Sequence, residues 1–262
     1  MKVAVGASAT GIIHVHTAYS HDGRDSIADL ASWARERGIA FVAITDHAED
    51  LDEQRWMSLV DECRMHSGDD LTLFPGLEFR FDGFPGLHLL ACGLRRWITP
   101  ATPVEFIADA EGVCDLTVGA HPGIWRRACP TDVLKALNAV EVWNGGYNTR
   151  YLPDPIAMEM VQDLQKMGSG TVATVGPDQH DRRNDKELRI VVRSAAAQAL
   201  TAIREGRFKN HGKTMAFGSR LDSMDLTLPL LRVARMSLDL LSKVQDRMVR
   251  LLRRARGARS GT

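Results

Sequence analysis

Two short apolar runs, each closed by histidine or aspartate, constrain the fold of this chain more than any other feature. The first run ends in His14 and His16, and the second, after a helix-like segment, ends in Asp46 and His47. Alternate residues of a strand point to one face, so the first two imidazoles can aim at one point. Two strands joined by a helix tend to lie parallel, which brings their carboxyl ends to one edge of a sheet. Nitrogen and oxygen ligands gathered there can hold Zn, Mn or Fe without cysteine.

Strands alternate with helices over most of the remaining chain. The helix after the first run has Ser26 as a plausible N-cap and ends near Gly38. This alternation predicts an α/β fold built on a parallel sheet. Further helices are predicted at 52–66, 103–110, 131–137, 155–167 and 194–205, and further strands at 39–45, 71–81, 87–93, 116–120, 140–143 and 171–175.

Ligand-type side chains follow several of the predicted strands, while His88 begins the strand that returns after Glu78. In a parallel barrel the carboxyl ends of the strands form the active face, so these side chains should meet there. The chain has nine histidines, and six of them belong to this set, which is more than scattered surface residues would supply. The candidates are His14, His16, Asp22, Asp46, His47, Glu78, His88, His121, Asp178 and His180.

The segments that carry these residues resemble the motifs of the PHP family, the polymerase and histidinol phosphatase superfamily. HVHTAYSHDG and ITDH resemble its first two motifs, AHP resembles the third and GPDQH the fourth. PGLEF and HLLACG resemble segments that supply further ligands, and VEVWNG resembles the strand before the last motif. The resemblance covers roughly residues 11–207 and implies a distorted seven-stranded β/α barrel that holds up to three metal ions.

The resemblance also implies how the ligands are grouped. Glu78 would bridge two metals, and Asp46 would hold one imidazole by a hydrogen bond. His21 stands beside Asp22, and Asp22 is the preferred ligand because it aligns with the Asp-Gly turn of the motif. The implied groups are His14, His16, Glu78 and Asp178 for one metal, Glu78, His88 and His121 for a second, and Asp22, His47 and His180 for a third.

Two or three clustered divalent ions suit displacement at phosphorus, because they activate a water and clamp the attacking and leaving oxygens. The sequence therefore predicts a metal-dependent hydrolase that cleaves a phosphomonoester or nucleotide-type ester. Arg126 follows His121 closely and Arg182 follows His180, so these two arginines are predicted to bind the phosphate. Together with Asp46 and His180 they make up the predicted catalytic set. Further candidates are Arg80, Arg127, Arg150 and Arg183.

The sequence leaves the substrate open among nucleotides, histidinol phosphate, sugar phosphates and short oligonucleotides. Nucleic acid is expected to bind only as a substrate, and not as a separate partner. Trp125, Trp143 and Tyr147 lie near ligand-bearing strand ends, where an aromatic ring can stack on a nucleobase or pack in the core.

Two other interpretations compete with the phosphoesterase. A hydrolase of the amidohydrolase type usually bridges its metals with lysine, and no lysine stands at a predicted strand end. The second alternative is an inactive, metal-stabilised PHP domain that acts as a binding module, and the complete ligand set argues against it.

The bulk composition is typical of a cytoplasmic protein without a membrane span. Lys+Arg and Asp+Glu are both 33, and no apolar run reaches about 18 residues. The N-terminal residues lack the regions of a signal peptide. The four cysteines are scattered without a C-x-x-C pair, so they are predicted to be reduced and mostly buried.

The C-terminal segment differs in charge from the rest, and we expect a barrel domain over 1–222 and a helical tail over 223–262. Residues 229–262 contain nine Lys or Arg and two Asp. We expect the tail helix to pack by its apolar stripe on the barrel or on a second copy in a homo-oligomer. Binding of its arginines to an anionic surface is the alternative. The stripe consists of Leu230, Ala234, Leu241, Val244, Met248 and Leu251.

Overall fold

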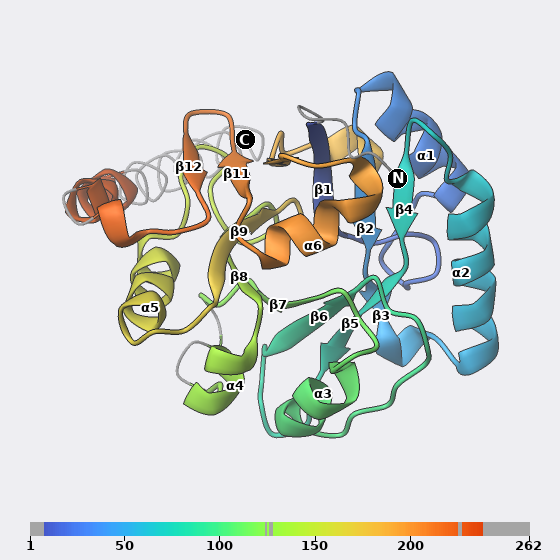
Figure 1. Ribbon diagram of the computed structural model, residues 1–262, viewed down its shortest axis with the longest axis horizontal. Helices are drawn as coiled ribbons and strands as arrows, with labels where there is room; N and C mark the ends of the chain where they lie inside the picture. Colours follow the sequence, from blue (N-terminus) through green and yellow to red (C-terminus); the bar gives the residue numbers. More distant parts are fainter. Residues whose placement is uncertain (1–7, 124, 126–127, 225–226, 238–262) are drawn as a thin grey trace, which may run out of the picture. The chain divides into compact units, whose positions relative to one another are not determined.

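A computed structural model describes residues 8–123, 125, 128–224 and 227–237 of the chain. In this part of the chain the strands form two six-stranded sheets, with helices packed around them (Figure 1). The residues up to Ser223 form one compact unit, and those from Met224 belong to a second. The second unit is helical over 227–237, and the rest of the predicted tail helix lies outside the described residues. The docking of the tail therefore stays a prediction.

The first sheet contains the strand that carries His14 and His16. Its order is β12-β11-β10-β1-β2-β4, in which β1, β2 and β4 are parallel and the remaining pairs are antiparallel. Every residue of β2 is buried, as is usual for a strand covered on both faces. The strands are β1 (Ala9–Val15), β2 (Phe41–Ile44), β4 (Thr72–Phe74), β10 (Arg189–Val192), β11 (Phe208–His211) and β12 (Ala216–Gly218).

The second sheet supplies most of the other ligand-type residues, in the order β3-β5-β6-β7-β8-β9. Strand β6 runs antiparallel to both neighbours, while the other pairs are parallel. The predicted parallel sheet is interrupted here because a tight turn returns the chain directly beside β5. The strands are β3 (Asp46–His47), β5 (Gly76–Arg80), β6 (His88–Cys92), β7 (Leu116–Ala120), β8 (Ala139–Asn144) and β9 (Val172–Gly176).

The two sheets meet at the strands that carry the candidate site. Thr45 alone separates β2 from β3, so one stretch of chain passes from the first sheet to the second. Val15, at the end of β1, forms an isolated parallel bridge with Gln179, which follows β9. The buried Asn210 of β11 donates from Nδ2 to the carbonyl oxygen of Ala173 in β9 at 2.9 Å. These links hold the carboxyl ends of β1, β3 and β9 close to one another.

The helices cover the sheets and begin at residues that cap them well. Ser26 Oγ accepts from the N–H of Asp29 at 3.1 Å at the start of α1, and Asp52 caps α2 in the same way. Helix α2 packs on β4, and α5 packs on β8 and β9 (Figure 1). The helices are α1 (Ile27–Glu36), α2 (Glu53–His66), α3 (Pro103–Ala110), α4 (Thr131–Ala136), α5 (Pro155–Lys166) and α6 (Ala199–Arg204).

The predicted α/β class is confirmed, although the strands differ from the prediction in two places. The strand predicted over 71–81 is divided at Pro75, which has no N–H to pair, and its halves β4 and β5 belong to different sheets. The sequence analysis does not predict β10, β11 and β12, which extend the first sheet as antiparallel strands. These strands have only three or four residues each, so their hydrophobic signal is weak.

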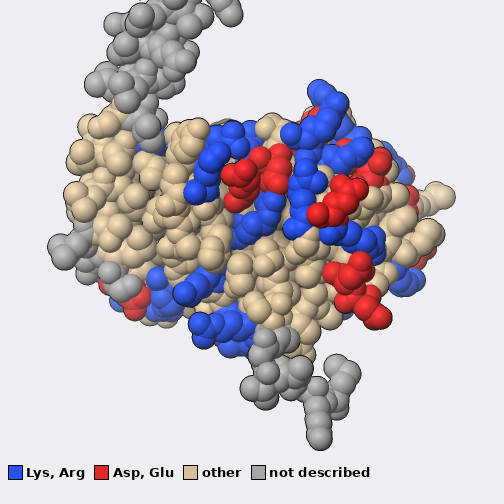
Figure 2. Space-filling model, turned by 90° about the horizontal axis from the view of Figure 1, so that it is seen from above, with Lys and Arg blue, Asp and Glu red and all other residues tan. Residues whose placement is uncertain are grey.

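Basic and acidic side chains intermingle on the face of the molecule that Figure 2 shows. Ion pairs follow the same pattern, as between Arg35 and Asp70 and between Arg189 and Asp185. A face of mixed sign does not favour the binding of a polyanion. Among the described residues, none of the helices has the length and apolar character needed to cross a membrane.

The cap of α5 gives a direct test of the fold. Asp154 accepts from the N–H groups of Ile156 at 2.9 Å and Ala157 at 3.4 Å, so Asp154→Ala leaves both without a partner. We expect this change to lower the free energy of unfolding by about 1 kcal/mol, measured by urea denaturation. The control is Asp163→Ala in the last turn of the same helix, where an acidic residue opposes the helix dipole. Equal losses in the two variants would contradict the capping role.

Candidate metal centre

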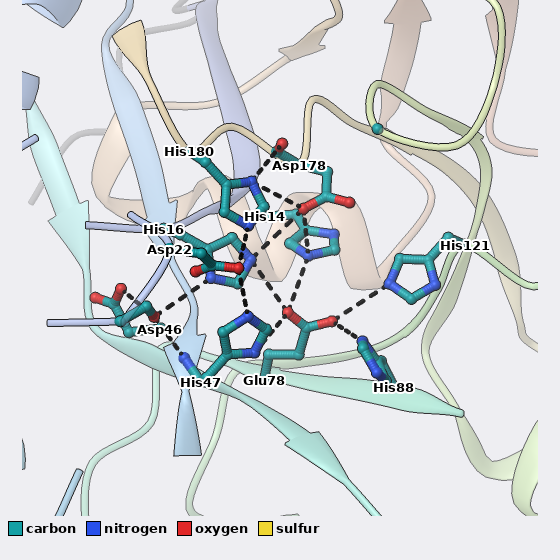
Figure 3. Close-up of polar contacts among 12 residues, drawn as sticks. His14, His16, Asp22, Asp46, His47, Glu78, His88, His121, Asp178 and His180 are labelled. Atoms are coloured by element: carbon teal, nitrogen blue, oxygen red, sulfur yellow. Dashed lines mark hydrogen bonds and ion pairs between the residues drawn. The ribbon is translucent and has the colours of Figure 1, made fainter. Parts of the chain in front are cut away.

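The side chains predicted as metal ligands converge in one cluster (Figure 3), and His88 enters it from the start of the antiparallel strand β6. They come from both sheets, so the junction of the sheets is what assembles the cluster. Within each of four groups, the ligand atoms all lie within 4.8 Å of one another. The groups are His16, Asp22, His47 and His180; His14, His121 and Asp178; His14, His16 and Glu78; and Glu78, His88 and His121.

Glu78 lies at the centre of the cluster and is buried. Its two carboxylate oxygens face different sets of imidazoles. Oε1 lies 2.6 Å from His88 Nδ1 and 3.4 Å from His121 Nε2. Oε2 lies 3.1 Å from His16 Nε2 and 3.4 Å from His14 Nε2. This division between the two oxygens is the arrangement that a bridging carboxylate needs.

The third predicted group also forms, around Asp22. Oδ2 of Asp22 lies 3.3 Å from His47 Nε2 and 3.1 Å from His180 Nε2. The neighbouring His21 is exposed and contacts Asp50 at 2.7 Å. The geometry therefore favours Asp22 over His21 as the ligand from the first motif. His16 also belongs to this group, so it stands between two of the predicted positions.

Three of these residues have an unusual backbone conformation. His14, His121 and Asp178 have φ values of 66°, 34° and 49°, in the left-handed region that residues other than glycine seldom adopt. His14 lies where the pairing of β1 with β2 shifts register. His14 and His16 do face the same cluster, but β1 is not a regular strand between them. The register shift and the positive φ at His14 set the direction of its ring. Such strain is maintained only where the surroundings fix it, as at binding sites.

Glu141, in β8, is a buried carboxylate that the sequence analysis does not select. His14 Nδ1 donates to its Oε1 at 2.8 Å, which leaves His14 Nε2 free to face the cluster. Its Oε2 accepts from the N–H of His121 at 3.0 Å and from Asn144 Nδ2 at 2.8 Å. A carboxylate behind a ligand histidine fixes the ring and its tautomer. The one signal in the sequence is a lone glutamate within an apolar strand, in VEVW.

Asp46 has a different role from the one that the resemblance implies. Its carboxylate accepts from Thr17 N at 2.7 Å, Thr17 Oγ1 at 2.6 Å and Ser20 Oγ at 2.7 Å. Ser20 Oγ in turn accepts from the N–H of His47 at 2.8 Å. Among the described residues, Asp46 therefore fixes the turn after β1 and orients imidazoles only through Ser20. The direct hydrogen bond to an imidazole belongs to Glu141 instead.

One of the two arginines chosen by sequence spacing, Arg182, does not take the expected place. Arg182 Nη1 binds Asp25 at 2.7 Å and Asp29 at 3.3 Å, and it does not line the cavity at the cluster. Arg126 lies outside the described residues. Arg80 lines the cavity, whose volume is about 320 Å³. Because Arg80 stands two residues after Glu78 in β5, both belong to the same face of that strand. That spacing is the signal that points to Arg80.

Of the three aromatic residues near the strand ends, one faces the cavity. Trp125 and Trp143 are buried in the core, and their indole N–H groups donate to backbone carbonyls. Tyr147 is 53% exposed, lines the cavity, and stacks at a tilt on His121 with 4.4 Å between ring centroids. Core packing is therefore the role of the two tryptophans, and Tyr147 is free to contact a substrate.

The charges of the cluster favour cations. Burial opposes protonation of His14, but the carboxylates of Glu141, Asp178 and Glu78 outweigh burial and raise its pKa well above the usual value. Burial alone would raise the pKa of Glu78, but His14 and the hydrogen bonds from neighbouring imidazoles hold it well below its usual range. Positive charge inside the cluster is thus stabilised, whether protons or metal ions carry it.

Orphaned ligand atoms show that these residues fit metal ions. Among the described residues, His16 Nε2 and His47 Nδ1 are buried without a hydrogen-bond partner. Both face Glu78 Oε2, at 3.1 Å and 3.4 Å, without the geometry of a hydrogen bond. Buried polar atoms without partners are costly, and a cation between them would satisfy both. Imidazole and carboxylate are the donors that Zn, Mn and Fe accept.

Comparison with known proteins agrees with the motifs. Residues 13–121 match the model of the PHP domain. The resemblance seen in the sequence is therefore confirmed. Over 202 residues the chain is 26% identical to a probable histidinol-phosphatase of Thermotoga maritima. The match covers 66% of this chain and 84% of that protein.

Two solved structures share the fold. The first is a two-domain protein from Bacteroides vulgatus that contains a predicted PHP-like metal-dependent phosphoesterase. It is 16% identical with a TM-score of 0.61, and the match covers 83% of this chain and 68% of that chain. The second is PsfC from Pseudomonas syringae, also 16% identical, with a TM-score of 0.53 and coverage of 88% and 99%.

The position of Glu141 predicts its effect on metal affinity. We expect Glu141→Gln to lower the affinity for a transition metal ion by about 10–100-fold, because a carboxamide holds the His14 ring less firmly. Competition with a chelator measures the affinity. Glu36→Gln, at an exposed carboxylate of α1, is the matched control and should leave the affinity unchanged. If both variants bind the ion like the unaltered chain, Glu141 does not position His14.

Proposed function

We propose that the protein is a metal-dependent phosphoesterase that hydrolyses a phosphomonoester or a nucleotide-type ester on a barrel of the PHP type. The observation that carries this proposal is Glu78, whose two oxygens face separate sets of imidazoles. A carboxylate in that position suits two neighbouring cations, and paired cations suit displacement at phosphorus. The PHP match and the named activity of the Thermotoga maritima relative support a hydrolase.

The proposed centre holds two or three divalent ions of Mn, Zn or Fe. When bound, such ions lower the pKa of water and neutralise charge on the phosphoryl oxygens. Glu141 and Ser20 would keep the ligand side chains in place, since Glu141 binds His14 and Ser20 binds the backbone of His47. The proposed ligands are His14, His16, Glu78 and Asp178 for the first ion, Glu78, His88 and His121 for the second, and Asp22, His47 and His180 for the third.

Arg80 is the residue that we propose for binding the phosphate. It is the one Lys or Arg among the described residues that line the cavity of the cluster. Its guanidinium can donate two parallel hydrogen bonds to phosphoryl oxygens. Glu49 Oε1 accepts from Arg80 Nη1 at 3.1 Å, which holds the arginine at the rim before a substrate arrives. The substrate would thus be oriented with its phosphate between Arg80 and the ligand cluster.

The rival functions have less support in the site. Among the described residues no lysine lines the cavity, whereas an amidohydrolase usually bridges its metals with one. An inactive binding module would have no need for a complete ligand set that gathers on buried strand ends. We propose that the phosphoesterase body spans 1–222 and that the segment over 223–262 is a separate tail. Removal of that tail should leave the proposed metal ligands in place.

A panel of phosphoesters tests the proposed activity. The purified chain, loaded with Mn, Zn or Fe, should release inorganic phosphate from at least one of nucleotides, histidinol phosphate and sugar phosphates. Removal of metal by a chelator should abolish the release, and adding the ion back should restore it, because the water is activated only at the loaded centre. Failure of the metal-loaded chain on the whole panel would favour the inactive module.

The bridging role of Glu78 has its own test. Glu78→Ala should lose more than one metal ion per chain, because a single carboxylate faces two sets of ligands. Elemental analysis counts the ions, and circular dichroism checks that the variant is folded. Glu36→Ala serves as the control at an exposed glutamate of α1. Full metal content in folded Glu78→Ala would rule out the bridge.

A further inference from the structure

A second cavity adjoins the metal centre, and we propose that it binds an aromatic group in the organic part of the ester. This inference rests on the proposed function, because it names the substrate class for that same site. The second cavity has a volume of about 610 Å³, against about 320 Å³ for the cavity at the cluster. The linings of the two cavities share Arg80, Gly86 and His88, so the cavities are neighbours.

The lining of the second cavity is partly polar, and its apolar residues include Phe79, Phe81, Phe84 and Trp97. Phe79 and Phe81 are buried and pack on Phe106, with ring centroids 5.4 Å and 6.1 Å away. Trp97, which is half-buried, rests on Trp56 with 6.4 Å between centroids. Because the core holds these rings from behind, the wall is fixed before a ligand binds. Phe79 and Phe81 support this wall, and the half-buried rings of Trp97 and Phe84 can offer stacking and edge contacts to another ring.

The charges at the second cavity indicate one phosphate at one end. Among the described residues, Arg80 is the one Lys or Arg in the linings of both cavities, and it stands at their junction. The described Asp or Glu residues that line the larger cavity are Glu49 and Asp82, which repel a second phosphate. A ligand with several phosphates, such as an oligonucleotide, is therefore disfavoured. The chemistry fits a monoester with a phosphate at Arg80 and a ring in the aromatic cavity.

The turn between β5 and β6 shapes the junction. Gly86 has a φ of 75°, a conformation that favours glycine, and it lines both cavities without a side chain of its own. The neighbouring Phe84 is half-buried and lines only the larger cavity. The size of the larger cavity lies within the range of about 300–1,000 Å³ that is usual for small-molecule sites. A ring and a short linker fit there.

Two non-hydrolysable phosphonates test the inference on the metal-loaded chain. Phenylphosphonate and methylphosphonate share the phosphonate group and differ by the ring, and calorimetry gives Kd for each. We expect phenylphosphonate to bind about tenfold more tightly, since the ring gains stacking and buried area. Hydrolysis should show the same preference, with kcat/KM higher for benzyl phosphate than for ethyl phosphate, two esters whose leaving alkoxides have similar basicity.

Variants separate the two parts of the site. Trp97→Leu should reduce the preference for phenylphosphonate severalfold, because the stacking surface is lost. Phe84→Leu, in a turn away from the core, gives the same test if Trp97→Leu does not fold. Arg80→Gln should weaken both phosphonates alike and keep their ratio. Tyr151→Leu is the matched control, since Tyr151 is 46% exposed and lines neither cavity.

The outcomes distinguish this inference from the proposed function. Equal Kd values for the two phosphonates, or an unchanged ratio in both wall variants, would overturn the aromatic site and leave the phosphoesterase standing. A chain that binds neither phosphonate and releases no phosphate from any ester would overturn the proposed function and this inference together. A ratio near ten that falls in the wall variants and persists in Tyr151→Leu supports the aromatic site.

Discussion

The whole site depends on one buried carboxylate. Glu78 is withdrawn from water, and a charged carboxylate in that position is costly unless positive charge and hydrogen bonds surround it. The chain meets this requirement with imidazoles drawn from β1, β6 and the segment after β7. Those strands belong to both sheets, so the site exists only where the sheets are joined. Any cation that binds there also stabilises the junction, because it binds the folded chain and not the unfolded one.

The geometry around Glu78 is maintained by two further buried carboxylates, Asp46 and Glu141. Asp46 fixes the turn after β1 through Thr17 and Ser20, and Glu141 ties His14 to the backbone of His121. These hydrogen bonds hold backbone conformations that would otherwise relax, including the positive φ of His14. Preorganisation of this kind lets a site bind its ions and substrate without first rearranging.

The sequence was informative where the signal is local. Histidines at strand ends, caps such as Ser26, and the order of motifs predict the ligand cluster and the α/β class, because each rests on short-range spacing. The role of Glu141 depends on how the two sheets join, because β8 and β1 belong to different sheets, and no local pattern contains that. Distance along the chain is a poor guide to which arginine lines the cavity: Arg182 stands close to His180 in sequence, yet it pairs with Asp25 and Asp29. Arg80, which was one of the further candidates, lines the cavity because it shares a face of β5 with Glu78.

Gly176, at the end of β9, shows how tightly the support of the site is packed. A side chain at this position would collide with Oε1 of Glu141 and would crowd the Cβ atom of His14, at 3.2 Å. The space beside Glu141 is therefore filled by the backbone of β9 itself. Positions 141 and 176 cannot diverge independently in evolution: a residue larger than glycine at 176 is compatible only with a shorter one at 141. Related chains that retain the glutamate should retain the glycine, and the pair should be gained or lost together.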